Sequence, residues 1–281
     1  MRRRLAVLGQ PISHSRSPAM HTAALAELGL GNDWSYEAIE VSSQEFEARV
    51  RAMPGEGFAG ANVTVPHKLA ALELADDASK AAHSIGAANT LSFDGGRIAA
   101  DNTDASGFLD ALPGRPSGSE ALVLGAGGSA RAVVWALVTN GAEVRIWNRT
   151  PERAARLAGE LGAAAVGPSE RPRTASFDLI VNATTVGMGA AGGGAASLKS
   201  LPIDADSLGE RHQLVDLAYG PAETELTRVA RSRGATVIDG LEVLVRQGAA
   251  SLRIWTGQDP PIETMRRAAT SAWQPTSAPD T

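Results

Sequence analysis

The sequence contains no cysteine, so disulfides, thiolate nucleophiles and cysteine-bound zinc are all excluded. A chain without cysteine also suits a reducing compartment. The histidines show no paired spacing of the kind that metal ligands need; they are His14, His21, His67, His83 and His212. We therefore expect no metal site.

Clusters of positive charge are also missing. The net charge is -5 and the basic residues are scattered, whereas a nucleic-acid groove needs clustered, uncompensated lysine and arginine. The first apolar run extends only from Leu5 to Leu8, which is far too short for a signal peptide. We expect a cytoplasmic protein that binds neither nucleic acid nor membranes.

The chain does contain enough apolar residues for two hydrophobic cores. Hydrophobic residues make up 43% of its 281 positions and charged residues 20%, as in an ordinary globular enzyme. At roughly 150 residues per domain, this length predicts two domains. In the first part, strand-like runs alternate with helix-like runs, which predicts an α/β fold with a mostly parallel sheet. The strands are expected at 5–8, 34–40 and 58–65, and the helices at 18–28, 43–52 and 67–75.

A hairpin and a small-residue segment separate this part from a second α/β unit. The glycines at 95 and 96 permit a turn between strands 89–93 and 97–100. A helix near 105–112 follows, and the second unit begins after residues 113–119. It is expected to contain a strand–helix–strand unit at 121–147, strands at 177–182, 213–218 and 235–238, and closing helices at 241–254 and 261–271.

A glycine-rich turn in the second unit has the pattern of a dinucleotide site. A strand at 122–124 runs into Gly125, Ala126, Gly127 and Gly128, and an apolar helix follows. In this pattern the first glycine allows the tight turn, the second lets a pyrophosphate approach, and Ala130 is as small as the usual third glycine. The helix start would bind the anion. The alternative is a glycine-rich turn that binds nothing.

The next strand indicates which dinucleotide is bound. It ends at Asn148, Arg149 and Thr150, where a protein that prefers NAD would usually have an acidic residue for the ribose hydroxyl. Arg149 and Arg153, together with Thr150, instead suit a 2′-phosphate. The sequence therefore predicts NADP rather than NAD. The alternative is a pair of surface arginines on a solvated helix start.

Two segments of the first unit offer polar groups for a substrate. The strand that contains Asn62 leads to Thr64 and Lys68, a hydroxyl and an ammonium four residues apart that suit a small polyol, and a helix is expected to start near Pro66. Taken alone, Lys68 would more often be a solvated lysine. Near the N-terminus, Ser17 is expected to cap the helix 18–28, which leaves Ser15 as a second hydroxyl beside a helix start where a carboxylate could bind.

Together these motifs resemble the shikimate dehydrogenase family. The resemblance runs in order from residue 5 to about residue 257 and rests on the joint pattern rather than on any one motif. In the first half it includes Ser15-Arg16-Ser17-Pro18, Asn62-Val63-Thr64-Val65-Pro66-His67-Lys68, Gly86-Ala87-Ala88-Asn89-Thr90 and Asp101-Asn102-Thr103-Asp104. In the second half it includes Gly125-Ala126-Gly127-Gly128, Asn148-Arg149-Thr150, Asn182-Ala183-Thr184, Val186-Gly187-Met188, Asp216-Leu217-Ala218-Tyr219-Gly220-Pro221, Asp239-Gly240-Leu241 and Gln247-Gly248-Ala249.

The resemblance implies an NADPH-dependent, reversible reduction of 3-dehydroshikimate to shikimate in the biosynthesis of chorismate and the aromatic amino acids. It implies that Lys68 and Asp104 form the catalytic pair. The residues implied to bind substrate are Ser15, Ser17, Thr64, Lys68, Asn89, Asp104, Tyr219 and Gln247. Those implied to bind cofactor are Gly125, Ala126, Gly127, Gly128, Ala130, Asn148, Arg149, Thr150, Arg153, Met188 and Gly240.

It also implies a domain division. Residues 1–104 and 241–281 would form a discontinuous substrate domain, and residues 105–240 a Rossmann-type NADP domain, with the cleft between them. The chain departs from the family at Ala105, where glycine is common, and at Val243, where methionine is common. Residues 189–196 are all glycine or alanine and are expected to form a mobile loop that gates the cofactor cleft. A monomer or a homodimer is expected.

Other interpretations are a sister enzyme that acts on quinate or aminoshikimate, and a non-catalytic NADP-binding sensor. Arg149 disfavours an NAD-dependent quinate enzyme, and a sensor would need neither Lys68 nor Asp104. Attraction to Asp104 favours the charged lysine and hinders its use as a base, so which of the two groups moves the proton stays open.

Overall fold

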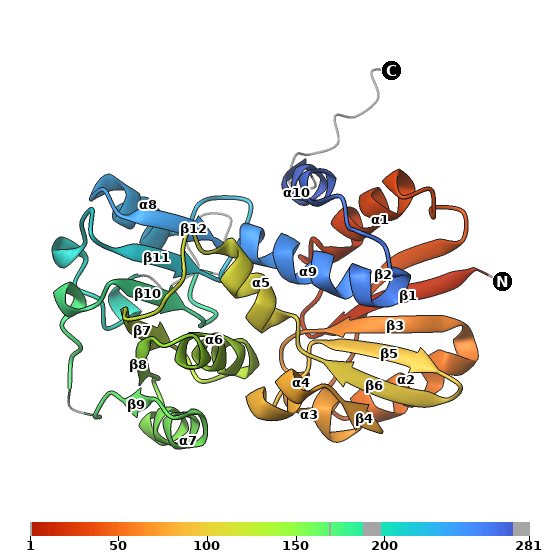
Figure 1. Cartoon of the computed structure of the whole chain (residues 1–281), viewed down its shortest axis with the longest axis horizontal. Helices are drawn as coiled ribbons and strands as arrows, with labels where there is room; N and C mark the ends of the chain where they lie inside the picture. The colour runs from red at the N-terminus through yellow and green to blue at the C-terminus, as the bar shows by residue number, and fades with distance from the viewer. Residues whose placement is uncertain (1, 169, 188–197, 272–281) are drawn as a thin grey trace.

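The computed structural model describes residues 2–168, 170–187 and 198–271, which contain two six-stranded sheets (Figure 1). The strands of the first sheet are β1 (Arg3–Gly9), β2 (Trp34–Glu40), β3 (Phe58–Val63), β4 (Asp77–Ala78), β5 (Thr90–Asp94) and β6 (Arg97–Asp101). Their order across the sheet is β2-β1-β3-β5-β6-β4. Only β5 is antiparallel to its neighbours, so the predicted mostly parallel sheet is confirmed.

The second sheet is parallel throughout. Its strands are β7 (Glu120–Leu124), β8 (Glu143–Trp147), β9 (Ala164–Ala165), β10 (Leu179–Asn182), β11 (Gln213–Asp216) and β12 (Thr236–Asp239). Their order is β12-β11-β10-β7-β8-β9, the doubly wound arrangement that binds dinucleotides. The order reverses between β7 and β10, and in such sheets the ligand crevice lies at the carboxyl ends of the strands beside this reversal.

Helices cover both sheets. They are α1 (Ser17–Glu27), α2 (Phe46–Ala52), α3 (Lys68–Glu73), α4 (Lys80–Ile85), α5 (Asp104–Ala111), α6 (Gly128–Thr139), α7 (Pro151–Leu161), α8 (Glu225–Ser232), α9 (Gly240–Thr256) and α10 (Ile262–Ser271). Among the described residues, none of these helices combines the length and the apolar character that a bilayer crossing requires.

Strand β1 is buried on both faces because its side chains alternate. Leu5 and Val7 pack with residues of α1, α9 and α10, whereas Ala6 and Leu8 pack on the opposite face with residues of α2 and α3. A parallel strand covered on both sides has a continuous apolar run as its sequence, which is why the sequence predicts it so clearly.

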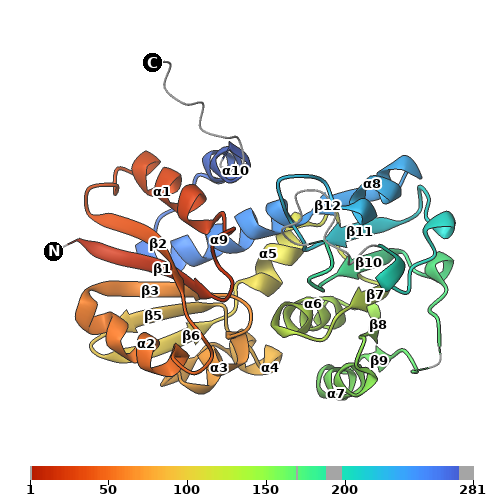
Figure 2. The same ribbon diagram turned by 180° about the vertical axis from the view of Figure 1, so that it is seen from behind.

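Helices α5 and α9 pack against each other between the two sheets (Figure 1). Although α9 directly follows β12 of the second sheet, its residues Val245, Leu252 and Trp255 belong to the core of the first sheet. Figure 2 shows α10 beside α1 on the same side of the molecule. The chain thus returns to its first half at its end.

Two predicted helix starts are wrong. Helix α3 begins at Lys68 rather than near Pro66, because residues 64–67 form a turn in which the His67 N–H donates to the Thr64 carbonyl at 2.9 Å. Helix α2 begins at Phe46 rather than at residue 43, because Glu45 closes a turn onto Ser42. In both places a local turn competes with the first helical turn.

Candidate active site

A cleft of about 210 Å³ lies between the two halves of the molecule. The first half contributes residues after β1 and β3, and the second contributes residues after β10 and β11 together with the start of α9. The structure brings all eight predicted substrate residues to this cleft, namely Ser15, Ser17, Thr64, Lys68, Asn89, Asp104, Tyr219 and Gln247. Gly240 also lines it.

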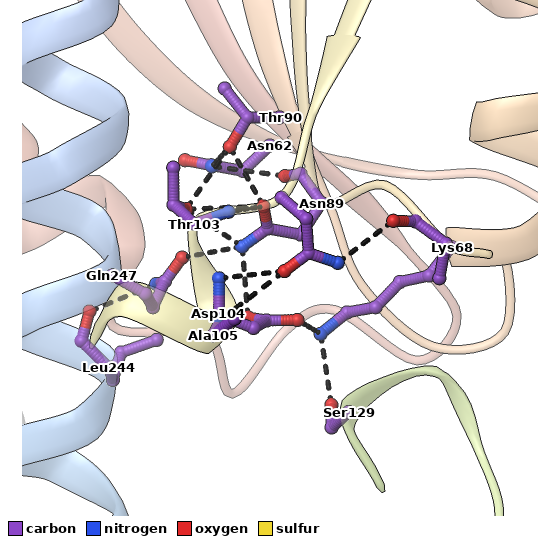
Figure 3. A network of polar contacts seen from close by, with 12 residues as sticks. Asn62, Lys68, Asn89, Thr90, Thr103, Asp104, Ala105, Ser129, Leu244 and Gln247 are labelled. Carbon is purple, nitrogen blue, oxygen red and sulfur yellow. Dashed lines mark hydrogen bonds and ion pairs between the residues drawn. The ribbon is translucent and has the colours of Figure 1, made fainter. Parts of the chain in front are cut away.

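The cleft contains a close ion pair. Lys68 is the first residue of α3 and Asp104 the first of α5, and their Nζ and Oδ2 atoms lie 2.5 Å apart (Figure 3). The two side chains are only 8% and 15% exposed, so water screens their attraction weakly. Burying an ammonium in this way requires such a partner. Lys68 is therefore not a solvated lysine.

The residue before the lysine is anchored in the core. The His67 ring is buried and stacks on Phe46 with centroids 4.4 Å apart, and its Nε2 atom lies 2.8 Å from the Val41 carbonyl. The Lys68 carbonyl accepts a hydrogen bond from the Ala88 N–H. These contacts fix the backbone from which the ammonium extends.

Asn89 connects the ion pair to α9. Its side-chain amide donates to Asp104 Oδ1 at 2.9 Å and to Gln247 Oε1 at 3.0 Å, and its Oδ1 atom accepts from the Thr103 N–H at 2.7 Å (Figure 3). The Gln247 amide in turn donates to the Leu244 carbonyl. A network in which each buried polar group has a partner holds its members in one geometry.

Of the two serines near the N-terminus, Ser15 lies beside the start of helix α1 as predicted, whereas Ser17 has a different role from the one predicted. Ser17 is the first helical residue and makes no side-chain cap, and its backbone N–H instead donates to Ser15 Oγ at 3.3 Å. The capping role expected for Ser17 is therefore wrong, and Ser15 bonds to the helix start. The residue that precedes the helix, Arg16, has the αR conformation that an N-cap side chain does not favour.

Tyr219 lines the same cleft from the second half. Burial raises the pKa of Tyr219, and the positive charge of the nearby Arg16 only partly opposes this. The phenol is therefore neutral at physiological pH and can donate a hydrogen bond. Desolvation lowers the pKa of Arg16, and the interaction with Tyr219 counteracts it.

The glycine-rich turn has the geometry of a nucleotide loop. Gly125 has a φ of 113°, which only glycine adopts readily, and a Cβ atom there would lie 2.9 Å from the Ala183 carbonyl oxygen. Gly127 precedes α6, whose first N–H groups have no helical partner, and Ala130 is fully buried in the core beneath. Ala126 lies half-buried between the glycines. This site can hold an anion at a helix start.

The residues predicted to bind the 2′-phosphate lie directly after β8 and in the first turn of α7, outside the lining of the cleft. Arg149, Thr150 and Arg153 are exposed, and Asn148 donates to the Thr150 carbonyl at 3.0 Å. Within the described ranges neither guanidinium has an ion-pair partner. The structure therefore leaves both arginines available to an anion but does not join them to the substrate residues. Met188 and the loop 189–196 lie outside the described residues.

The sequence reasoning missed two serines. Ser129, at the start of α6, accepts a hydrogen bond from Lys68 Nζ at 2.9 Å. Ser251 is fully buried on α9 and contacts Asn62, Thr90 and Thr103 at 2.8 to 3.0 Å. Ser251 lies four residues after Gln247, so helical spacing could have placed it on the same face. No pattern in the sequence indicates the contact of Ser129.

The two positions at which the sequence departs from the family lie beside the site, and their side chains make no polar contacts. Ala105 is buried in α5, where its backbone N–H donates to Asn102 Oδ1 at 3.3 Å. Val243 is buried on α9 and lines the cleft. Both positions contribute shape rather than hydrogen-bonding side chains.

This fold and cleft define a class of α/β protein in which a dinucleotide-binding unit faces a second unit that carries a buried lysine and carboxylate. Sequence comparison gives the family. Residues 7–91 match the shikimate dehydrogenase substrate binding domain, residues 111–188 match shikimate / quinate 5-dehydrogenase, and residues 240–270 match the shikimate 5'-dehydrogenase C-terminal domain.

Individual relatives agree over nearly the whole length. A shikimate dehydrogenase (NADP(+)) from Thermus thermophilus is 45% identical, with 96% of this chain and 98% of the relative covered. The crystal structure of a shikimate 5-dehydrogenase from Thermus thermophilus, in complex with NADP(H) and shikimate, superposes with a TM-score of 0.84 at 42% identity, covering 97% of this chain and 100% of that one. Quinate dehydrogenase from Corynebacterium glutamicum, in complex with NAD, gives 0.81 at 33% identity, covering 96% and 99%. The chain belongs to the shikimate dehydrogenase family.

Proposed function

We propose that this protein catalyses the reversible, NADPH-dependent reduction of 3-dehydroshikimate to shikimate, a step of chorismate and aromatic amino-acid biosynthesis. The observation that carries the proposal is the buried pair of Lys68 and Asp104 in a cleft beside a dinucleotide-type loop. The relatives that are named shikimate dehydrogenases and cover nearly the whole chain support it.

The polar groups of the cleft suit a small cyclic polyol acid. We propose that Ser15, Ser17 and Tyr219 bind the carboxylate, because all three carry hydroxyls and line the cleft, and the two serines lie at a helix start. We propose that the ring hydroxyls bind Thr64, Asn89, Asp104 and Gln247. The amides of this second group are already fixed by the network, which reduces the entropy lost on binding.

The catalytic roles follow from the charge that develops during reduction. NADPH, when bound, supplies the hydride to the carbonyl carbon of 3-dehydroshikimate. Negative charge then grows on the carbonyl oxygen, which the Lys68 ammonium stabilises within the buried site. One proton must reach this oxygen, and the ion pair of Lys68 and Asp104 is the group through which it passes.

The cofactor site is proposed in two parts. Gly125, Ala126, Gly127, Gly128 and Ala130 would receive the pyrophosphate at the start of α6. Asn148, Arg149, Thr150 and Arg153 would receive the 2′-phosphate, supported by the exposure of both guanidinium groups. Gly240 lines the cleft and would lie against the nicotinamide, and we propose Met188 for the same face from its sequence motif.

The domain division is proposed as residues 1–104 with 241–281, and residues 105–240. The membership of the two sheets and the packing of α9 on the first sheet support it. Limited proteolysis that releases a stable fragment ending outside these boundaries would contradict it. We further propose a cytoplasmic monomer or homodimer, and light scattering would measure the oligomeric state.

One assay tests the proposed function. Purified protein is mixed with NADP and, separately, with shikimate, quinate and aminoshikimate, and the absorbance band of the reduced nicotinamide is followed. We expect the highest kcat/KM with shikimate. A higher value with quinate or aminoshikimate would assign the sister activity, and no absorbance change with any of the three would support a non-catalytic sensor.

A further inference from the structure

A hydroxyl of the nucleotide-binding half touches the ammonium of the substrate-binding half. Ser129 is the second residue of α6, and its Oγ atom accepts a hydrogen bond from Lys68 Nζ at 2.9 Å. Figure 3 shows Ser129 and Asp104 reaching the ammonium from different segments of the chain. The dinucleotide motif explains its glycines by turn geometry and close approach, but it requires no hydroxyl at this position.

The packing of the α6 backbone against Lys68 places Ser129 next to the ammonium. A Cβ atom on Gly128 would lie 2.9 Å from Lys68 Cβ and 3.1 Å from Lys68 Cδ, so the start of α6 packs along the stem of the lysine. The lysine itself is only 7% exposed. Because both partners are held by their surroundings, the Ser129 contact is not the chance position of a flexible surface side chain.

The contact with Ser129 limits the orientations that the Lys68 ammonium can adopt. A lysine ammonium has three N–H groups, of which Asp104 accepts one and Ser129 a second. Two fixed bonds determine where the third N–H points, whereas one bond would leave the ammonium free to rotate. The remaining donor can therefore be aimed at a substrate oxygen in the cleft, which Ser129 and Lys68 both line.

We propose that Ser129 is a positioning residue for Lys68. It orients the ammonium and joins it to the helix whose N-terminus follows the nucleotide loop, so that the proton-handling group and the bound nicotinamide keep a fixed spacing. Transition-state stabilisation depends strongly on such placement of a charged donor. This inference rests on the proposed function, because its effect is measured on hydride transfer.

The test compares wild-type protein with Ser129→Ala. A hydrogen bond to a charged group contributes about 1.5–3 kcal/mol, so we expect kcat to fall roughly 10- to 100-fold. We expect the KM values for shikimate and NADP to change less than about threefold, since Ser129 acts through Lys68. The deuterium isotope effect on kcat, measured with shikimate labelled at the reacting carbon, should increase because hydride transfer becomes more rate-limiting.

A double-variant comparison separates positioning from a general structural effect. In a Lys68→Ala background, Ser129→Ala should change the residual rate less than twofold, because its partner is already absent. Thr139→Ala is the matched control, since it removes from the same helix a hydroxyl that donates to carbonyls of α6 itself. We expect this control to retain wild-type kcat.

Two results would overturn the inference. One is a kcat for Ser129→Ala within twofold of wild type, and the other is an equal loss with and without Lys68. Failure of the proposed function has a different signature, because the wild-type protein would then prefer quinate or aminoshikimate to shikimate, or would oxidise none of the three substrates.

Discussion

Three residues fix the position of Lys68 and its ammonium. His67 anchors its backbone, Asp104 balances its charge, and Ser129 contacts it from α6. Removing one partner of a buried ion pair leaves the other charge uncompensated, which costs several kcal/mol. The side chain is therefore placed for chemistry and is also coupled to the stability of the cleft.

Replacing Lys68 by alanine should affect turnover far more than binding. We expect Lys68→Ala to lower kcat by orders of magnitude, roughly 1,000-fold, because it removes both the charge opposite the developing alkoxide and the proton path. The KM for shikimate should rise less. Steady-state kinetics would measure both parameters, with the exposed Lys80→Ala as the matched control. Near-normal turnover of Lys68→Ala would refute the assignment.

His21 is buried where protonation is unfavourable. Its ring is fully buried, stacks on Tyr36 with centroids 4.1 Å apart, and lies within 3.2 Å of the Ser17 and Gly248 carbonyls. Desolvation outweighs these two carbonyls and lowers its pKa from 6.5 to about 4. The ring is therefore neutral at pH 7, and only one of its two carbonyl contacts is a hydrogen bond.

This lowered pKa predicts a loss of stability in acid. Between pH 6.5 and 4 the unfolded chain binds a proton at His21 that the folded chain does not, so the free energy of unfolding should fall by up to about 3 kcal/mol. Below pH 4 this contribution should be constant. Urea denaturation at several pH values would measure it, with His21→Phe as the comparison. A pH dependence of equal slope in His21→Phe would contradict the prediction.

At the scale of the element, helix α9 contributes apolar packing on the first sheet and two polar side chains to the buried network. Its apolar residues cover the first sheet, Gln247 binds the Asn89 side chain in the cleft, and Ser251 sits one turn further along. Ser251 is fully buried and shares its hydroxyl with Asn62, Thr90 and Thr103. The helix thus holds the polar network together from one side.

Removing this hydroxyl should destabilise the fold. In Ser251→Val the amide of Asn62 loses its best acceptor and stays buried, which should lower the free energy of unfolding by about 1–3 kcal/mol. Thr256→Val on the same helix is the control, because its hydroxyl bonds within the local turn; we expect a change below about 0.5 kcal/mol. Urea denaturation would give both values, and equal stabilities would reject this role.

Some structural elements could be predicted from the sequence, and others could not. Strand β1 and the loop at Gly125 could be predicted because a run of apolar residues and a glycine with positive φ each have a local cause. The exact starts of α2 and α3 could not, because short turns with their own hydrogen bonds precede them. The partners of Ser129 and Ser251 depend on which distant segments of the chain meet: Ser129 contacts the first residue of α3, and Ser251 contacts β3, β5 and the residue before α5. Helical spacing relates Ser251 to Gln247, but it does not identify these partners.

At the scale of the whole molecule, the two halves meet through direct contacts as well as through α5 and α9. On α6, Arg131 donates to the Ile85 carbonyl at the end of α4 at 2.6 Å and also pairs with Glu160 at 2.6 Å. A cation at the C-terminal end of a helix is favoured by the helix dipole. Together with the contact between Lys68 and Ser129, this holds α6 against the first half.

The preference for NADP over NAD also depends on the whole molecule, because the proposed 2′-phosphate site lies outside the cleft. In the variant with both Arg149→Ala and Arg153→Ala, kcat/KM for NADP should fall about 10- to 100-fold while kcat/KM for NAD changes little, since two charge-assisted contacts are lost. The control is Arg156→Ala, because Arg156 is an exposed arginine on α7, the helix that also contains Arg153. Equal efficiency of the wild type with NAD and NADP would reject the preference.

Because α9 covers the first sheet although it follows the last strand of the second, no single cut separates the two halves. A fragment that stops before residue 240 would expose the surface that Val245, Leu252 and Trp255 now cover, and it should aggregate. Chimaeras that exchange nucleotide units between relatives therefore need two junctions, one ahead of β7 and one at the β12–α9 boundary.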